Sequence, residues 1–287
     1  MKVINVILIT GFLICLVLYG VHLYHGQFPD MDVLNHAYPV VTYNGPDDPP
    51  DVDLELKRPR TWVALVEIPK AVQGAVLVSE DWAFFTHKGY DPAMIENAIK
   101  EDLAKGKFKR GASTLTQQVV KNVFLEKDKT LWRKAKEFFL AVRLEKAVSK
   151  KKILEVYFNI AEWGQGVYGI RAAAQAYFQK HPSELTPKEG AFLAMLLPSP
   201  KRYSQSYRAK KLTLYASKTI LNILRNMERA GYIDAGERSS QAQTPLGFEE
   251  KALGGQKGDM EPEPDPDRED TEEVPVGSSK LHDSSDE

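Results

Sequence analysis

Cysteine is nearly absent from this sequence, which has only Cys15 among its 287 residues. A single cysteine excludes an intrachain disulfide and a cysteine-based metal site. No cluster of His, Asp and Glu has the spacing of a dedicated metal site either. Runs of alternating apolar and polar residues, which are typical of half-buried strands, do not recur along the chain, so we predict a predominantly α-helical body.

Charge is missing from the N-terminus, where no charged residue lies between Lys2 and Asp30. Residues 6–21 are almost uninterruptedly apolar, and with their neighbours they reach the roughly 20 residues that cross a bilayer. No small-residue cleavage site precedes Gln27, so residues 1–26 are predicted to be an uncleaved transmembrane anchor rather than a signal peptide. Lys2 keeps the start of the chain inside, which places the body outside.

Aromatic residues are absent after Phe248, where acidic residues, Pro, Gly and Ser dominate. Such a segment buries too little surface to order itself, so residues 236–287 are predicted to be a disordered acidic tail. Fourteen acidic and four basic residues lie from Glu249 to Glu287, a net charge of −10. This leaves +9 for residues 1–248, because the whole chain carries −1. The basic body is therefore the part expected to meet an anionic partner.

Between the anchor and the tail, the sequence predicts an irregular connector over residues 27–60 and one helical domain over residues 61–235. Asp91-Pro92 and two capping boxes, which open at Thr114 and Thr186, are helix-start signals. The expected helices lie between Asp91 and Gly106, after Ser113 or Thr114, and over residues 131–148, 150–159, 170–178, 187–198 and 207–230.

A cationic stretch from residue 105 to residue 152 holds fifteen basic and four acidic residues. Taken alone, such a run favours a solvated helical face. Here the segment RGASTLTQQVVKN interrupts the charge and sets Gln117 with Lys121, and Gln118 with Asn122, one helical turn apart. Hydroxyls and amides hydrogen-bond sugars, while Lys and Arg bind phosphate. A surface made only for solubility would not need amides in pairs.

Two carboxylates allow acid–base chemistry, and each also has a simpler interpretation. Glu80 precedes Trp82 and Phe84, either at a helix end beside a solvated turn or as a partly desolvated general base with a raised pKa. Glu137 follows Arg133 by four residues, which by itself favours an intrahelical ion pair over a second catalytic carboxylate.

In order and spacing, five segments resemble the successive motifs of family 51 glycosyltransferases, the peptidoglycan transglycosylases of bacteria: EDWAFFTHKG (80–89), RGASTLTQQVVKN (110–122), RKAKE (133–137), KKILEVYFN (151–159) and IAEWGQGVYGIRAAA (160–174). The resemblance covers roughly half of the chain. NIAEWGQGVYG is most similar to the monofunctional, membrane-anchored branch. A Ser-x-x-Lys at Ser149 to Lys152 lies inside the fourth motif, and no Lys-Thr-Gly or second domain accompanies it, so no transpeptidase is expected.

The resemblance implies a mainly α fold, with a lysozyme-like helical head and a smaller membrane-proximal lobe, preceded by one N-terminal transmembrane helix. It implies that Glu80 is the general base, which deprotonates the GlcNAc 4-hydroxyl of lipid II. That oxygen would attack the lipid-linked end of the growing glycan with inversion and release undecaprenyl pyrophosphate. Glu137 would stabilise positive charge at the anomeric carbon or assist the leaving group.

Further site residues follow from the same motifs. Lys121 and Arg133 are expected to hold the pyrophosphate. Lys129 stands where many relatives carry Arg, and it keeps the charge but loses the bidentate fork. The residues expected to bind substrate are Ser113, Thr114, Gln117, Gln118, Lys121, Asn122, Lys129, Arg133 and Lys134. Those expected to support the site are Asp81, Phe84, His87, Gly89, Glu155 and Asn159.

The resemblance implies no obligatory cofactor, although a divalent cation such as Mg²⁺ can sit on the pyrophosphate. The expected partners are lipid II, the growing lipid-linked glycan, the membrane and other cell-wall synthesis or division proteins. Nucleic acid is not expected, because the anchor exports the basic body. The predicted location is the bacterial cytoplasmic (inner) membrane, single-pass, with the catalytic domain on the outer (periplasmic) side.

Two other functions are compatible with the sequence. A lysozyme-like peptidoglycan hydrolase or lytic transglycosylase would share two carboxylates in a helical fold, but it would not need a cationic, amide-lined helix beside them. A noncatalytic, membrane-tethered scaffold would use the basic surface on anionic lipid. Elongation of lipid II would distinguish a polymerase from both.

Overall fold

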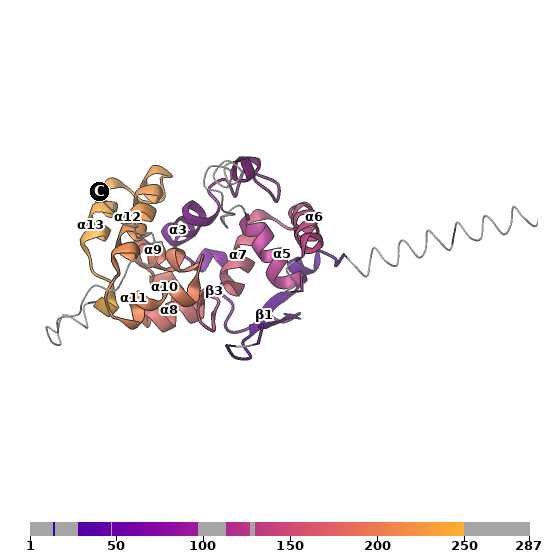
Figure 1. Ribbon diagram of the computed structural model, residues 1–287, viewed down its shortest axis with the longest axis horizontal. Coiled ribbons are helices and arrows are strands. Elements are labelled where there is room, and N and C mark those ends of the chain that lie inside the picture. Colours follow the sequence, from indigo (N-terminus) through magenta and orange to yellow (C-terminus); the bar gives the residue numbers. More distant parts are fainter. Residues whose placement is uncertain (1–13, 15–27, 47, 97–112, 127–129, 250–287) are drawn as a thin grey trace, which may run out of the picture. The chain divides into compact units, whose positions relative to one another are not determined.

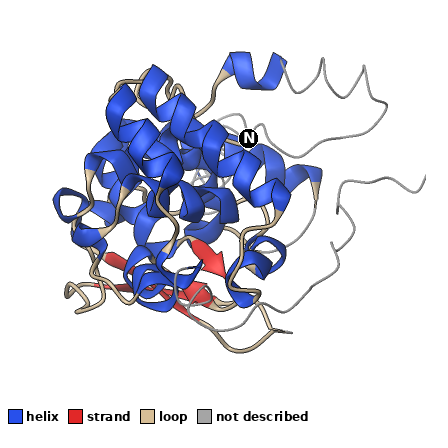
Figure 2. Cartoon of the chain, turned by 90° about the vertical axis from the view of Figure 1, so that its left-hand side faces the viewer, coloured by secondary structure: helices blue, strands red, loops and turns tan. Residues whose placement is uncertain are grey.

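The computed structural model describes Ile14 and residues 28–46, 48–96, 113–126 and 130–249. The body is mainly helical, as predicted, and its two antiparallel sheets have two strands each. Figure 2 shows the strands on one side of the helices. The elements are α2 (Val33–His36), β1 (Tyr38–Thr42), β2 (Asp51–Glu55), η1 (Leu65–Glu67), α3 (Lys70–Glu80), α5 (Leu115–Phe124), α6 (Leu131–Ala147), α7 (Lys150–Ile160), β3 (Glu162–Gly164), β4 (Val167–Tyr168), α8 (Ile170–Phe178), η2 (Pro182–Glu184), α9 (Pro187–Leu196), α10 (Pro200–Tyr203), α11 (Gln205–Arg208), α12 (Leu214–Arg229) and α13 (Ala235–Gln243).

Several predicted segments lie outside the described residues. They are the anchor over residues 1–26 apart from Ile14, the tail from residue 250 onward, Lys129, and residues 97–106 of the helix expected after Asp91. In the part of the chain that is described, no helix is long and apolar enough to cross a bilayer.

Two groups of helices build the body. α3, α9 and α12 pack against one another, while α5 packs against α6 and α7 (Figure 1). The core includes the fully buried side chains of Phe158, Trp163 and Phe192. In the first group, α3 ends at Glu80. In the second group, α5 begins at Leu115, directly beside the end of α3. The candidate site therefore lies where the two groups meet.

Side-chain caps explain where the helices begin. Thr114, Ser149 and Thr186 each accept a hydrogen bond from the backbone N–H three residues later. A cap of this kind typically stabilises a helix by about 1 kcal/mol. The predicted caps at Thr114 and Thr186 are confirmed. Ser149 serves as a cap too, because its hydroxyl accepts from the Lys152 backbone N–H, while the Lys152 amine donates to Glu155 at 3.0 Å.

The irregular connector predicted over residues 27–60 is wrong for the segment that forms the β1–β2 hairpin. Tyr38 pairs with Glu55, and Thr42 pairs with Asp51. The strands carry Pro and Asp, which propensity disfavours, but β1 packs against α7. This tertiary contact stabilises the hairpin, and the local amino-acid composition gives no sign of it.

The single helix predicted over residues 207–230 is two helices. α11 ends at Arg208, and α12 begins only after the Thr213 cap. Lys210 lies between them with φ of 54°, a left-handed conformation that cannot continue a right-handed helix. At the other end Gly231, with φ of 75°, stops α12 as predicted.

The disordered tail predicted from residue 236 begins too early. α13 covers Ala235–Gln243, and the side chains of Leu246 and Phe248 are buried. The Phe248 ring lies 5.3 Å from Phe192 and 5.4 Å from Tyr207, measured between centroids. Two apolar residues are enough to order this segment because they dock on an aromatic surface that already exists.

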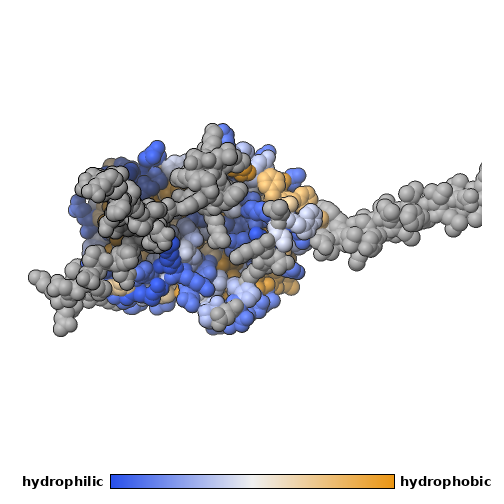
Figure 3. Space-filling model, viewed as in Figure 1, coloured by the Kyte–Doolittle hydropathy of each residue, from blue (hydrophilic) through white to orange (hydrophobic). Residues whose placement is uncertain are grey.

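α6 exposes three aromatic side chains, Trp132, Phe138 and Phe139, of which Trp132 is the most exposed at 65%. Figure 3 shows apolar colour interrupting the hydrophilic surface beside this helix. Exposed aromatics gathered on one helix mark an interaction surface more often than scattered single residues do.

Candidate active site

Glu80 is the last residue of α3, and α5 holds its carboxylate. Gln118 Nε2 donates to Glu80 Oε2 at 2.9 Å, while the Tyr157 hydroxyl donates to Gln118 Oε1 at 3.4 Å. The two contacts orient the Gln118 amide with its nitrogen toward Glu80. Burial raises the pKa of Glu80, the Gln118 hydrogen bond opposes that rise, and the Asp81 charge adds to it. A carboxyl with a raised pKa is suited to general base catalysis near neutral pH.

The aromatic neighbours of Glu80 are arranged differently from the prediction. Phe84 is fully buried, but the Trp82 side chain is 54% exposed. Trp82 therefore does not enclose the carboxylate, as the sequence had led us to expect. Phe84 packs edge-on against His87, and the Lys150 amine lies 4.4 Å from the Phe84 ring centroid.

Asp81 joins the end of α3 to the start of α5. Its Oδ2 accepts a hydrogen bond from the Leu115 N–H at 2.9 Å, and His87 Nε2 lies 3.0 Å from each of its oxygens. The Thr114 hydroxyl donates to the Gly89 carbonyl at 2.9 Å. This hydrogen bond holds the loop that follows Asp81 against the start of α5. A carboxylate at a helix N-terminus is also stabilised by the helix dipole.

Polar contacts and close packing support the loop between Asp81 and Gly89. Glu145 of α6 accepts hydrogen bonds from Thr116 at 2.6 Å and from Lys150 at 2.7 Å. The same Lys150 amine lies 3.4 Å from His87 Nδ1. Gly89 has φ of 93°, and a Cβ there would lie 2.8 Å from the α6 backbone, so only glycine fits.

Glu137 on α6 is buried, with 2% exposure, and two cations neutralise it. Arg133 Nη1 donates to Glu137 Oε2 at 3.2 Å, and the Lys134 amine donates to Glu137 Oε1 and to Ser113 Oγ, the latter at 3.0 Å. The predicted ion pair four residues apart is present. Arg133 Nε is buried and has no hydrogen-bond partner among the described residues.

Lys121 on α5 lies in the electrostatic field of both carboxylates. Burial lowers the pKa of its amine, and the charges of Glu137 and Glu80 oppose that lowering. Lys134 and Arg133 lower the pKa further, because like charges repel. Lys121 therefore interacts electrostatically with both carboxylates, while Arg133 and Lys134 contact Glu137. Clustered cations of this kind suit an anionic group.

The side chain of Gln117 is buried and acts as part of a helix cap. Its Oε1 accepts a hydrogen bond from the Thr114 N–H at 2.9 Å, which closes the capping box. Gln118 and Asn122, on a different face of α5, line a pocket instead. Of the two predicted pairs, only Gln118 and Asn122 present their amides to open space.

Glu155 and Asn159 of α7 hold the segment that precedes α3. Glu155 accepts hydrogen bonds from Trp62 Nε1 and from the Leu65 N–H, each at 3.0 Å. Asn159 accepts from the Val63 N–H and donates to the Val63 carbonyl, both at 2.8 Å. Both residues support the site without reaching into it.

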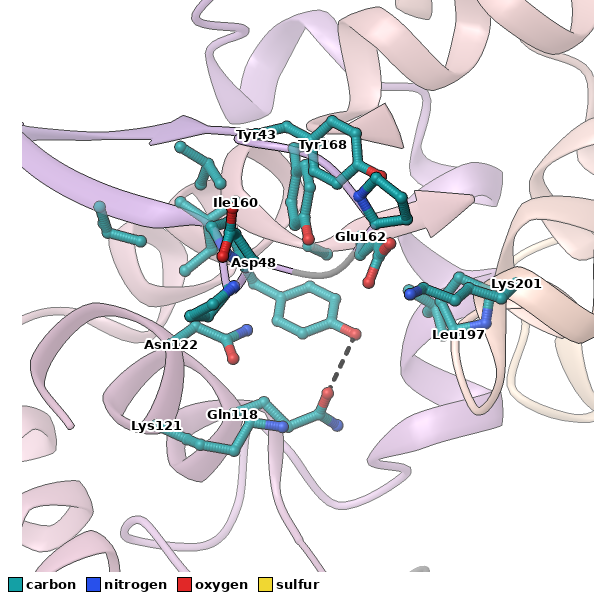
Figure 4. Close-up of a pocket in the computed structure, with 18 of the residues that line it drawn as sticks. Tyr43, Asp48, Gln118, Lys121, Asn122, Ile160, Glu162, Tyr168, Leu197 and Lys201 are labelled. Carbon is teal, nitrogen blue, oxygen red and sulfur yellow. Dashed lines mark hydrogen bonds between the residues drawn. The ribbon is translucent and has the colours of Figure 1, made fainter. Parts of the chain in front are cut away.

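A pocket of about 570 Å³ opens beside Gln118, between the β1–β2 hairpin, α5, the end of α7, the β3–β4 turn and α10 (Figure 4). Its lining residues include Tyr43, Glu162, Tyr168 and Lys201, which were not singled out from the sequence. Glu162 and Tyr168 belong to the segment NIAEWGQGVYG, and its acidic and aromatic residues could have been recognised as candidate lining residues. Tyr43 lies in the stretch that was taken for a connector.

Comparisons with known proteins match the sequence of this chain to a family. Residues 52–227 match a family described as Transglycosylase. The chain is 41% identical to a biosynthetic peptidoglycan transglycosylase of Nitrosomonas eutropha over 53% of this chain and 62% of that protein. It is 38% identical to another, of Nitrosospira multiformis, over 59% and 72%. It is also 38% identical to penicillin-binding protein 1F of Bacillus subtilis over 76% of this chain and 30% of that protein.

The chain thus spans less than two thirds of the first and third of these relatives. The matched residues 52–227 include Glu80, Lys121, Glu137 and Glu162, but not Tyr43.

Replacing Glu80 with Gln is expected to change how the free energy of unfolding depends on pH. Because burial raises the pKa of Glu80 in the folded state, the wild type loses stability as pH rises from the unfolded-state pKa through the folded-state pKa. Gln cannot ionise, so the stability of Glu80→Gln relative to wild type should rise between about pH 4 and about pH 8. Denaturant unfolding at both pH values measures this, with the exposed Glu126→Gln as control. A constant difference would contradict the burial of the Glu80 charge.

Proposed function

The chain belongs to the transglycosylase family, and on that premise we propose that it polymerises the glycan strands of peptidoglycan from lipid II. The observation that carries this proposal is the placement of Glu80, held by Gln118, in the same electrostatic field as Lys121 and the Glu137 cluster. One carboxylate takes a proton while fixed cations stabilise a departing diphosphate. The names of the relatives support peptidoglycan as the product.

In the proposed reaction, Glu80 accepts the proton of the GlcNAc 4-hydroxyl of an incoming lipid II. The freed oxygen attacks the anomeric carbon of the lipid-linked MurNAc at the end of the growing strand. The bond from that carbon to the α-linked pyrophosphate breaks, and its electron pair leaves with undecaprenyl pyrophosphate. A β-1,4 bond forms with inversion, because attack and departure occur on opposite faces of the sugar.

The leaving group gains negative charge as it separates, and the cations near Glu137 are placed to stabilise it. The guanidinium of Arg133 and the amines of Lys121 and Lys134 are the proposed contacts. Glu137 holds two of these cations in position and keeps their mutual repulsion low. A divalent cation such as Mg²⁺ would bind the pyrophosphate oxygens. Among the described residues there is no group of three or more His, Cys, Asp or Glu side chains that could hold a metal ion.

We place the protein at the outer face of the bacterial cytoplasmic (inner) membrane, anchored by residues 1–26. The exposed aromatics of α6, Trp132, Phe138 and Phe139, support a membrane-proximal lobe beside a lysozyme-like helical head. A substrate whose lipid tail stays in the bilayer would then enter laterally. Other cell-wall synthesis or division proteins are the proposed partners.

We propose a monofunctional enzyme without transpeptidase activity. The Ser149 hydroxyl caps α7, and the Lys152 amine lies over the rings of Tyr38 and Trp62 while it pairs with Glu155. Neither group is placed to activate the other as a nucleophile and base.

Glu80→Gln should lower kcat for lipid II polymerisation by about 10²- to 10⁴-fold, the range typical of a lost general base. The assay follows labelled lipid II into polymer on a gel and measures the release of undecaprenyl pyrophosphate. Glu126→Gln, which changes an exposed carboxylate, should polymerise like wild type. Full activity of Glu80→Gln would refute the assignment of the base, and cleavage of preformed glycan without elongation would indicate a hydrolase or lytic enzyme.

Lys121→Met should lower kcat/KM by about 10- to 100-fold, because a charge-assisted hydrogen bond contributes about 1.5–3 kcal/mol. Lys129→Met should have a smaller effect, since our assignment gives the pyrophosphate to Lys121, which shares the field of both carboxylates. Steady-state kinetics on both variants tests the ranking. The opposite order would overturn the pyrophosphate assignment.

A further inference from the structure

A second cationic stretch lies outside the candidate active site, on α10, α11 and α12. From Lys201 to Arg229 the chain carries eight basic residues and one acidic residue, Glu228, a net charge of +7. All eight basic residues are exposed. Glu228 pairs with Arg238 of α13, with 2.6 Å between Glu228 Oε2 and Arg238 Nε. The acid of this stretch is therefore already occupied by a cation from another helix, and the stretch keeps its excess of positive charge.

Four residues of α12 form one outward stripe. Leu214, Lys218, Leu221 and Arg225 follow one another at intervals of four, three and four residues, so they share one face of the helix. Leu214 is 72% exposed and Leu221 is 42% exposed. Lys218 and Arg225 are exposed too, and neither has an ion-pair partner among the described residues. The opposite face of α12 packs on α3 and α9, so the stripe faces away from the core.

The spacing of the two leucines indicates what the stripe binds. Leu214 and Leu221 are seven residues apart, which is the repeat with which one helix packs along another in a coiled coil. Lys218 and Arg225 each follow a leucine by four residues, so a charge flanks each apolar position, as charges flank the apolar seam of a coiled coil. Single exposed leucines are common on protein surfaces, but a face made only for solubility does not need two of them in register with its cations.

Three kinds of partner fit a cationic surface, and the stripe favours one of them. A second copy of this chain would set like charges against each other across a two-fold interface. Trp and Tyr, which anchor proteins at a bilayer surface, are absent from the exposed positions of α12. Three exposed aromatics lie instead on α6, which belongs to the other helix group and lies at the other end of the body in Figure 1. An acidic helix with an apolar seam satisfies both the charge and the spacing.

We propose that the outward stripe of α12 is a docking site for an acidic amphipathic helix of a partner protein. Leu214 and Leu221 would pack against the apolar seam of that helix, while Lys218 and Arg225 would pair with its Glu or Asp side chains. The 16 residues of α12 span about 24 Å, room for about four turns of a partner. None of the four residues belongs to the candidate active site, so the inference does not rest on the proposed function.

Binding of a synthetic peptide to the full-length protein tests the docking site. The probe is a fluorescent helix about three heptads long, with Leu once in each heptad and Glu on either side of it. Fluorescence anisotropy measures its affinity in the absence of lipid II. The double variant Lys218→Glu, Arg225→Glu should weaken binding by about tenfold or more, because it sets like charges against the probe. The double variant Leu214→Ser, Leu221→Ser should weaken binding to a similar degree, because it removes the apolar contact.

Matched controls separate the stripe from positive charge in general. The double variant Lys57→Glu, Arg60→Glu changes two exposed cations outside α12 and should bind the probe like wild type. Two further peptides, one with Ser in place of Leu and one with Lys in place of Glu, should bind about tenfold or more weakly than the probe. Thermal melting confirms that each variant is folded.

The docking site is refuted if the probe does not bind, if both α12 variants bind it like wild type, or if the Ser peptide binds as well as the probe. Displacement of the probe by detergent micelles that contain phosphatidylglycerol, but not by those that contain phosphatidylcholine, would assign the stripe to anionic lipid instead.

The polymerisation assay distinguishes this inference from the proposed function. Without the probe, both α12 variants should polymerise lipid II like wild type, and a loss would place the stripe in the catalytic machinery and overturn the docking site. A wild type that does not polymerise lipid II would refute the proposed function, while probe binding that is lost in the α12 variants would still support the docking site.

Discussion

The hydrogen bonds of Asp81 hold the two halves of the site together. Its carboxylate binds the first N–H of α5, at Leu115, and the His87 ring, while the preceding residue, Glu80, ends α3. One turn into α5, Gln118 reaches back to Glu80. Without Asp81, the Leu115 N–H of α5 and the His87 ring would lose their shared partner, at a cost of about 1–3 kcal/mol each. The geometry of the base is therefore fixed by a neighbour that need not touch substrate.

Burial shifts the pKa values of ionisable groups at the end of α3 and on α5. Desolvation raises the pKa of Glu80 and lowers that of Lys121, so each group is less strongly committed to its charged form than in water. Glu137 is buried, and Arg133 and Lys134 both contact its carboxylate. The base Glu80 and the cationic side chains can therefore lie close together without one directly neutralising the other.

The sequence predicted the parts of this protein that local signals determine. The cap at Thr114 and the stop at Gly231 each depend on a single residue, so these two helix ends were predicted correctly. The hairpin and the segment around Phe248 were missed because packing against α7 and against Phe192 orders them, and neither contact is local. In the site, helical spacing could pair Gln118 with Asn122, but it could not tell that Gln117 turns inward to cap its own helix. The Tyr43–Tyr168 contact joins residues 125 positions apart and has no counterpart in a one-dimensional pattern.

The central claim is that a partly buried Glu80, held by Gln118, acts as the base, and the pH dependence of kcat/KM for lipid II tests it most directly. The acid limb should have its midpoint above 4.5, the ordinary value for a Glu side chain, because burial raises this pKa. In Gln118→Leu the midpoint should move higher still, since the hydrogen bond that opposes the rise is gone. An acid limb at or below the ordinary value, or one that Gln118→Leu leaves in place, would contradict the account.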